Sequence, residues 1–219
     1  YLYKWESYPS EEEQQLAKDG GLELEIVRVV KEGFVFFVNK EISIDNLTLT
    51  QIQDIYSGKV TNWKEVGGTD AQILAYQRPQ NSGSQSGMLS LVMQGIKMKE
   101  PEKETVAQSM VDIVDVVSDY QNKENAIGYS YYYYITTMYS KDKIKLLSVN
   151  GIEPTYDNIK TGLYNIQTAY YAVIRKDEPE NSDARKLLNA MISTYVQKVA
   201  MEGGYVQIYL RKIYLCCYI

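Results

Sequence analysis

Segments with strand-like and helix-like patterns alternate along almost the whole chain, and this alternation restricts the fold more than any other feature. Runs rich in β-branched and aromatic residues predict strands at 22–30, 34–38, 72–77, 126–135, 144–149 and 169–174. Helix-forming composition, cap signals and, in several segments, apolar residues at helical spacing predict helices at 11–18, 49–57, 88–98, 106–120, 155–162 and 184–202. We therefore expect an α/β fold in which mostly parallel sheets are flanked by helices.

The segment from residue 34 to residue 58 carries the clearest local signals. Residues 34–38 are apolar without interruption, which is typical of a strand that is buried on both faces. Thr48 and Gln51, three residues apart, form a capping-box pattern at the start of a helix. Gly58 is placed to end that helix.

Composition excludes several classes of function. The chain has no histidine, so a Ser-His-Asp triad and a His-ligated zinc site are both impossible. The net charge of −5 gives no overall basic field, which makes nucleic acid a poor partner. The same charge means that any anion site must be built locally, from an arginine and backbone N–H groups. We expect no catalytic residues, no metal site and no cofactor.

The cysteines and the chain ends carry little information. Cys216 and Cys217 are adjacent, so they cannot join distant segments, and we expect them to have no role. No apolar run is long enough to span a bilayer. The first residues do not resemble a secretory signal, so an export signal would lie outside this chain.

The stretch after the predicted strand at 72–77 is suited to bind an anion. Arg78 offers a planar fork of N–H donors that matches two oxyanion oxygens. Ser82 and Ser84 carry hydroxyl donors, and Gly83 lets a ligand approach the backbone closely. The loop leads into a helix, whose first N–H groups have no internal partners. The alternative is an ordinary polar loop with a helix cap, because Gly, Ser and Asn are common in loops.

Two enzyme motifs do not fit this loop. A phosphate-binding Walker loop needs a lysine after its last glycine, but Met88 follows Gly87. A nucleophile elbow needs serine between two glycines, but Gln85 stands midway between Gly83 and Gly87.

Several stretches, in order along the chain, resemble the phosphate-binding solute-binding proteins of phosphate ABC importers, especially their Gram-positive branch. The most specific is IYSGKVTNWKEVGG, at residues 55–68. The matching stretches are residues 8–13, 33–40, 46–52, 55–68, 77–85, 125–130 and 150–155. They cover nearly the whole chain up to the neighbourhood of Tyr205.

This resemblance implies a two-lobed, periplasmic-binding-protein-like fold. Residues 1–39 and 168–219 would form the first lobe, and residues 40–167 would form the second lobe with the anion loop. The resemblance also implies that the loop binds inorganic phosphate or a similar tetrahedral oxyanion. The implied ligand-binding residues are Arg78, Ser82, Gly83, Ser84 and, through its backbone N–H, Gln85.

The implied function is extracytoplasmic binding, without catalysis, for delivery to an ABC importer. The implied partners are the permease subunits of that importer. The family resemblance places the protein in the periplasm or at the cell surface, as a lipoprotein in its full-length form. Membrane association would then depend on an anchor that is not in this chain.

The family's Ser/Thr-rich phosphate loop of the first lobe has no counterpart before Tyr1. We therefore expect this chain to bind phosphate weakly or not at all. The alternatives are an anion-sensing or surface-interaction module, a degenerate copy that has lost binding, and an enzyme acting on phosphate esters. Phosphate, sulfate, molybdate and tungstate remain open as ligands, because all are tetrahedral oxyanions.

Overall fold

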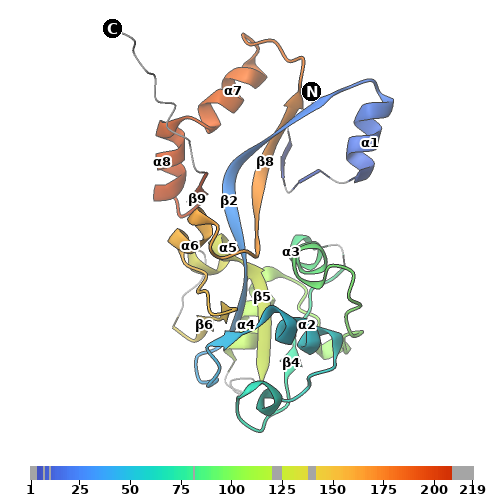
Figure 1. Ribbon diagram of the computed structural model, residues 1–219, viewed down its shortest axis with the longest axis vertical. Helices are drawn as coiled ribbons and strands as arrows, with labels where there is room; N and C mark the ends of the chain where they lie inside the picture. The colour runs from blue at the N-terminus through green and yellow to red at the C-terminus, as the bar shows by residue number, and fades with distance from the viewer. Residues whose placement is uncertain are drawn as a thin grey trace. The chain divides into compact units, whose positions relative to one another are not determined.

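The computed structural model describes residues 4–6, 8–9, 11–80, 82–119, 125–137 and 142–208. The chain divides into two compact units, residues 1–31 with 169–219 and residues 32–168 (Figure 1). The combination of helices with sheet strands confirms the α/β class. The lobe division expected at residues 39/40 and 167/168 stays a prediction.

The unit formed by residues 1–31 and 169–219 has helices packed on sheet strands. Its strands are β1 (Lys4–Glu6), the first part of β2 (Leu24–Asn39), β8 (Gln167–Arg175) and β9 (Val206–Gln207). Its helices are α1 (Glu11–Asp19), α7 (Asp183–Met191) and α8 (Thr194–Glu202). Figure 1 shows α7 and α8 on the β9 side of β2, whereas α1 lies beyond β8.

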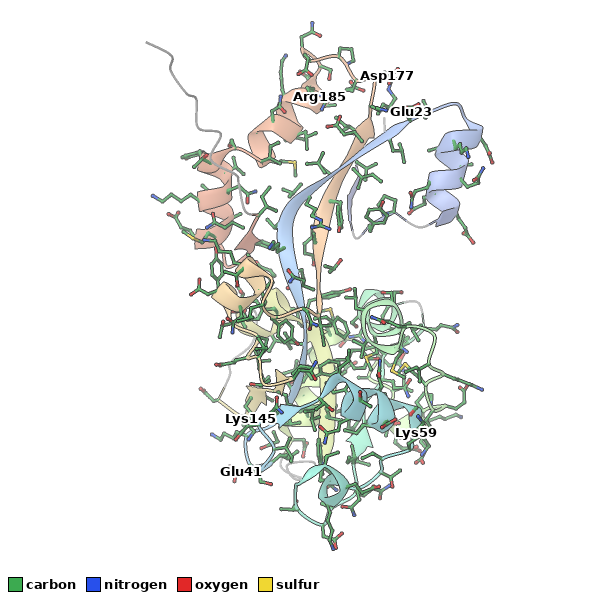
Figure 2. All side chains as sticks on the ribbon, viewed as in Figure 1. Glu23, Glu41, Lys59, Lys145, Asp177 and Arg185 are labelled. Atoms are coloured by element: carbon green, nitrogen blue, oxygen red, sulfur yellow. The ribbon has the colours of Figure 1, made fainter. Side chains whose placement is uncertain are left out.

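An apolar core joins α7 to the strands of this unit. Its members are Val29, Val30, Ala172, Ile174, Ala184 and Leu188. Arg185, which Figure 2 labels on α7, adds an ion pair whose Nη2 lies 2.8 Å from Glu25 Oε2. The amphipathic pattern of α7 therefore places apolar residues and one arginine against β2 and β8.

Residues 32–168 form a second unit around the second part of β2. β2 pairs antiparallel with β5 (Ala126–Tyr131) and β6 (Ile144–Leu146), and β5 pairs in parallel with β4 (Leu74–Ala75). β3 (Asn46–Leu47) and β7 (Ser148–Val149) form a separate parallel pair. The helical segments are α2 (Leu49–Ser57), η1 (Trp63–Val66), α3 (Gly83–Gly87), η2 (Met88–Met93), η3 (Lys103–Thr105), α4 (Met110–Ser118), α5 (Tyr132–Thr137) and α6 (Tyr156–Thr161).

Side chains from helices cover both faces of β2 in this unit. On one face, Val35 and Phe37 belong to a buried cluster with Ile113 of α4. On the other face, the Phe36 ring lies 6.3 Å from the Tyr56 ring of α2, measured between centroids. Residues 34–38 are all 0% exposed, so the predicted burial on both faces is confirmed.

The predicted start and end of α2 are also confirmed. Thr48 Oγ1 accepts from Gln51 N–H at 3.1 Å, and Gln51 Oε1 accepts from Thr48 N–H at 2.8 Å. Gly58 follows the helix with φ 82°, in the left-handed region that glycine adopts at low cost. Both signals depend only on residues that are close together in the sequence, so both helix ends could be predicted from the sequence.

Strand direction differs from the expectation of mostly parallel sheets. Among the described strand pairs whose direction is defined, β1–β8, β2–β5, β2–β6 and β2–β9 are antiparallel, and β3–β7 and β4–β5 are parallel. Apolar periodicity marks a strand but does not determine which distant strand lies beside it. For example, Phe34 lies opposite Tyr131.

Several element boundaries also differ from the prediction. Residues 31–33 continue β2, so the strands predicted at 22–30 and 34–38 are one strand. A Cβ on Gly33 would lie 2.6 Å from Ile159 Cδ1 of α6. The glycine thus permits close packing of a helix on the strand. The strand predicted at 126–135 ends at Tyr131 and continues as α5. The strand predicted at 72–77 is reduced to Leu74–Ala75.

The helix predicted at 184–202 is two helices, α7 and α8. Ser193 separates them and caps α8, with its side-chain oxygen accepting from Val196 N–H at 3.3 Å. A capping serine competes with helix continuation because its hydroxyl satisfies N–H groups of a new helix. Residues 210–219, with Cys216 and Cys217, lie outside the described residues.

Candidate functional site

The candidate anion loop follows β4. The two residues before Arg78, Tyr76 and Gln77, make backbone hydrogen bonds to two different neighbouring segments. Tyr76 N–H donates to the Ile127 carbonyl of β5 at 3.0 Å. Ala107 N–H donates to the Gln77 carbonyl at 3.0 Å. Arg78 therefore leaves the sheet from a fixed position. The loop then enters α3, which lies beside β5 in Figure 1.

Arg78 is buried, with 8% of its surface exposed, yet its guanidinium has few partners. Nη2 lies 3.5 Å from the Gln108 carbonyl, and Nε and Nη1 are buried without a partner among the described residues. Burial lowers the pKa of Arg78, and the nearby Tyr129, Asp112 and Tyr134 act in the opposite direction. The guanidinium stays charged. A buried charge without acceptors costs free energy, so an anion here would be stabilising.

The segment from Ser82 to Ser84 presents further donors. Ser82 caps α3, with its Oγ accepting from Gln85 N–H at 3.2 Å. The N–H groups of Gly83 and Ser84 have no acceptor among the described residues, as expected for the first turn of a helix. Ser84 is 2% exposed, and its hydroxyl is buried without a partner in the part of the chain that the structure describes.

Gln85 is used differently from the expectation. Its N–H, expected to face the ligand, donates to Ser82 Oγ. Its side-chain Oε1 instead accepts from Arg78 N–H at 3.2 Å and from the Tyr129 hydroxyl. The same hydroxyl accepts from Arg78 N–H at 3.1 Å. The Gln85 side chain thus joins the beginning of the loop to its end.

Gly87 allows α3 to lie directly on the sheet. A Cβ at this position would lie 2.7 Å from the Tyr131 hydroxyl and 2.9 Å from Phe34 Cε2. The Tyr131 hydroxyl donates to the Gly83 carbonyl at 3.1 Å. Strand β5 therefore fixes both the start and the end of this short helix.

The structure brings all the candidate residues onto one closed loop. Arg78 and Gln85 are in direct hydrogen-bond contact, and the capping bond of Ser82 places Gly83 and Ser84 between them. Sequence reasoning missed Tyr129. Its one signal was its place in the matching stretch at 125–130, because nothing in the local pattern relates it to a loop 51 residues earlier.

Other kinds of site have no support in the described ranges. No cluster of three or more His, Cys, Asp or Glu side chains there could hold a metal ion. In the same ranges, no helix has the length and apolar character needed to cross a membrane.

Comparison with known proteins gives a family match over most of the chain. Residues 7–196 match the model of the PBP superfamily domain. A phosphate-binding protein PstS from Bacillus subtilis is 29% identical over 182 residues, which are 83% of this chain and 57% of that protein. The PstS protein of Borreliella burgdorferi is 28% identical over 184 residues, covering 81% of this chain and 63% of its own. The chain thus spans less than two thirds of the length of these relatives.

Solved structures give the same picture of the fold. A Clostridium perfringens structure with bound phosphate, described as a phosphate ABC transporter substrate-binding protein, has a TM-score of 0.73 and 27% identity. The matched region is 94% of this chain and 79% of the Clostridium perfringens chain. An ABC-type phosphate transport receptor from Vibrio cholerae has a TM-score of 0.74 at 24% identity, covering 93% of this chain and 78% of its own. At this level of sequence identity, the similarity to the Vibrio cholerae structure shows the fold alone.

Proposed function

Because this chain belongs to the PBP superfamily, we propose that it binds inorganic phosphate, or a similar tetrahedral oxyanion, through the loop from Arg78 to Gln85. The observation that carries the proposal is a set of buried donors on that loop that have no partner within the described ranges. They are Nε and Nη1 of Arg78 and the hydroxyl of Ser84. A tetrahedral oxyanion accepts several hydrogen bonds at once, so one ligand would satisfy these donors together.

Each residue of the loop has a role in this proposal. Arg78 directs its fork at two ligand oxygens. The N–H groups of Gly83 and Ser84 and the Ser84 hydroxyl donate to the others. The Ser82 oxygen already accepts from Gln85 N–H, which leaves its hydroxyl hydrogen free to donate. Gln85 holds the loop closed through its side chain.

The relatives support phosphate as the ligand. The Bacillus subtilis and Borreliella burgdorferi proteins are named as phosphate-binding, and the Clostridium perfringens structure contains phosphate. We extend the proposal to delivery of the anion to the permease subunits of an ABC importer, outside the cytoplasm. Attachment to the membrane as a lipoprotein belongs to the same proposal. The role is binding without turnover.

Gly83→Ala should separate ligand approach from folding. No atom of the described residues lies within 4 Å of a Cβ added at Gly83, and its backbone is outside the left-handed region. The free energy of unfolding should therefore stay constant or rise by about 0.5–1 kcal/mol. The added methyl would stand beside an N–H that we assign to the ligand, so phosphate binding should weaken by about 1–3 kcal/mol.

Urea unfolding and calorimetric titration with phosphate measure the two effects of Gly83→Ala separately. Unchanged phosphate affinity in a fully folded variant would show that the ligand does not approach the backbone at this position.

A further inference from the structure

The hydroxyl of Tyr129 joins the two ends of the candidate loop. It accepts from Arg78 N–H at 3.1 Å and donates to Gln85 Oε1. Gln85 Oε1 in turn accepts from Arg78 N–H at 3.2 Å. One phenol oxygen and one amide oxygen therefore hold the backbone from which the Arg78 side chain departs.

The Tyr129 ring is a rigid support for this hydroxyl. Tyr129 is 0% exposed, and its ring packs against three other aromatic rings. The centroid distances are 5.4 Å to Tyr56, 5.6 Å to Phe34 and 6.5 Å to Phe36. These rings come from α2 and from β2, whose residues at 34–38 are fully buried. The hydroxyl thus has a position set by the core of the unit.

The Tyr129 hydroxyl stays protonated at neutral pH. Burial raises the pKa of Tyr129 well above its usual value, while the Arg78 N–H and the Arg78 charge act in the opposite direction. A neutral phenol donates to Gln85 Oε1 and accepts from Arg78 N–H at the same time. Phenylalanine would fill the same space and lose both hydrogen bonds.

We propose that Tyr129 is a positioning residue that sets the Arg78–Gln85 loop in its anion-binding geometry without touching the ligand. This inference rests on the proposed function, because it assigns the loop to phosphate. A loop that is already held in place loses less conformational freedom when the ligand binds. Without the hydroxyl, Gln85 would keep one hydrogen bond to Arg78 N–H, and that N–H would lose its hydrogen bond to the buried ring system.

Tyr129→Phe tests this role, with Tyr164→Phe as the matched control. Tyr164 is also buried in residues 32–168, and its hydroxyl donates to the Phe34 carbonyl at 2.8 Å instead of to a residue of the Arg78–Gln85 loop. Amide hydrogen exchange followed by NMR reports the protection of Arg78 N–H in the absence of ligand. Calorimetric titration with inorganic phosphate reports affinity.

We expect Tyr129→Phe to increase exchange at Arg78 N–H and to weaken phosphate binding about tenfold, which is on the order of the net contribution of a hydrogen bond. Tyr164→Phe should lower thermal stability and leave both readouts at the parent values. Parent-like exchange and affinity in Tyr129→Phe would overturn the inference. Equal losses in both variants would overturn it too, since they would indicate a merely structural role.

The two readouts separate this inference from the proposed function. Absence of phosphate binding by the parent protein would overturn the proposed function. The exchange measurement would still show whether Tyr129 holds Arg78. Binding that depends on Arg78 but is unaffected by Tyr129→Phe would overturn the inference alone.

Discussion

Arg78→Ala is expected to weaken phosphate binding by about 2–5 kcal/mol, the usual cost of removing one partner of a desolvated charge pair. The structure gives the reason, since the guanidinium is buried and two of its nitrogens have no partner among the described residues. Arg78→Lys should recover only part of the loss, because an ammonium group carries the charge without the planar fork. Calorimetric titration with phosphate measures both variants.

Lys59→Ala is the control for the loss of one positive charge. Lys59 belongs to the same unit, and Figure 2 shows it at the surface. Its side chain is 69% exposed, and its Nζ lies 3.1 Å from Asp54 Oδ1. This substitution should leave phosphate affinity unchanged. An equal loss in both variants would point to a general charge effect, and parent-like binding by Arg78→Ala would contradict the site assignment.

The second large effect concerns the pH dependence of stability and arises from Glu32. Glu32 is 1% exposed. Its Oε1 accepts from the N–H groups of Gly33 and Tyr133, each at 3.1 Å, while Oε2 is buried and has no partner among the residues that the structure describes. Burial raises the pKa of Glu32 from 4.5 to about 7, although the backbone N–H groups act against it. The folded protein thus favours the protonated carboxyl group.

The sign of the effect follows from proton binding. Between pH 4.5 and about 7, the folded state holds a proton at Glu32 that the unfolded state has released. The stabilisation is therefore fully present below the unfolded pKa and is lost as pH rises through the folded pKa. A shift of this size corresponds to a loss on the order of 3 kcal/mol by pH 8.

Glu32→Gln should remove this loss of stability at rising pH, since an amide does not titrate. Urea unfolding at pH 5 and pH 8 measures the difference between parent and variant. Glu41→Gln is the control, because Glu41 is an exposed carboxylate of the same unit (Figure 2). Glu23 and Glu25, whose pKa values are lowered by Lys176 and Arg185, affect all the proteins equally. An identical pH dependence in parent and Glu32→Gln would contradict the assignment.

The sequence predicted those parts of the fold whose causes are local. The cap of α2 by Thr48 and Gln51 and its end at Gly58 lie within one short segment. The burial of residues 34–38 follows from their continuous apolar character. The Arg78 loop was proposed as an anion site from neighbouring residues, because its donors and its helix start are close together in the chain, and its ligand stays a prediction.

The features that the sequence did not predict depend on distant residues. Gly33 lay between two predicted strands, at 22–30 and 34–38, but its role is set by Ile159 of α6, which packs against it. The function of the Gln85 side chain could not be predicted without Tyr129, which reaches the loop from β5. Strand direction likewise depends on how distant segments meet, as in the antiparallel pairing of Phe34 with Tyr131.

The most direct test of the central claim is an NMR titration of the protein with inorganic phosphate, following every backbone amide. This measurement detects weak binding as well as tight binding. We expect saturable shifts centred on the amides of Arg78, Gly83, Ser84 and Gln85, and we expect Arg78→Ala to abolish them. Absence of shifts in this loop, shifts centred on another part of the chain, or the same titration in Arg78→Ala would contradict the account.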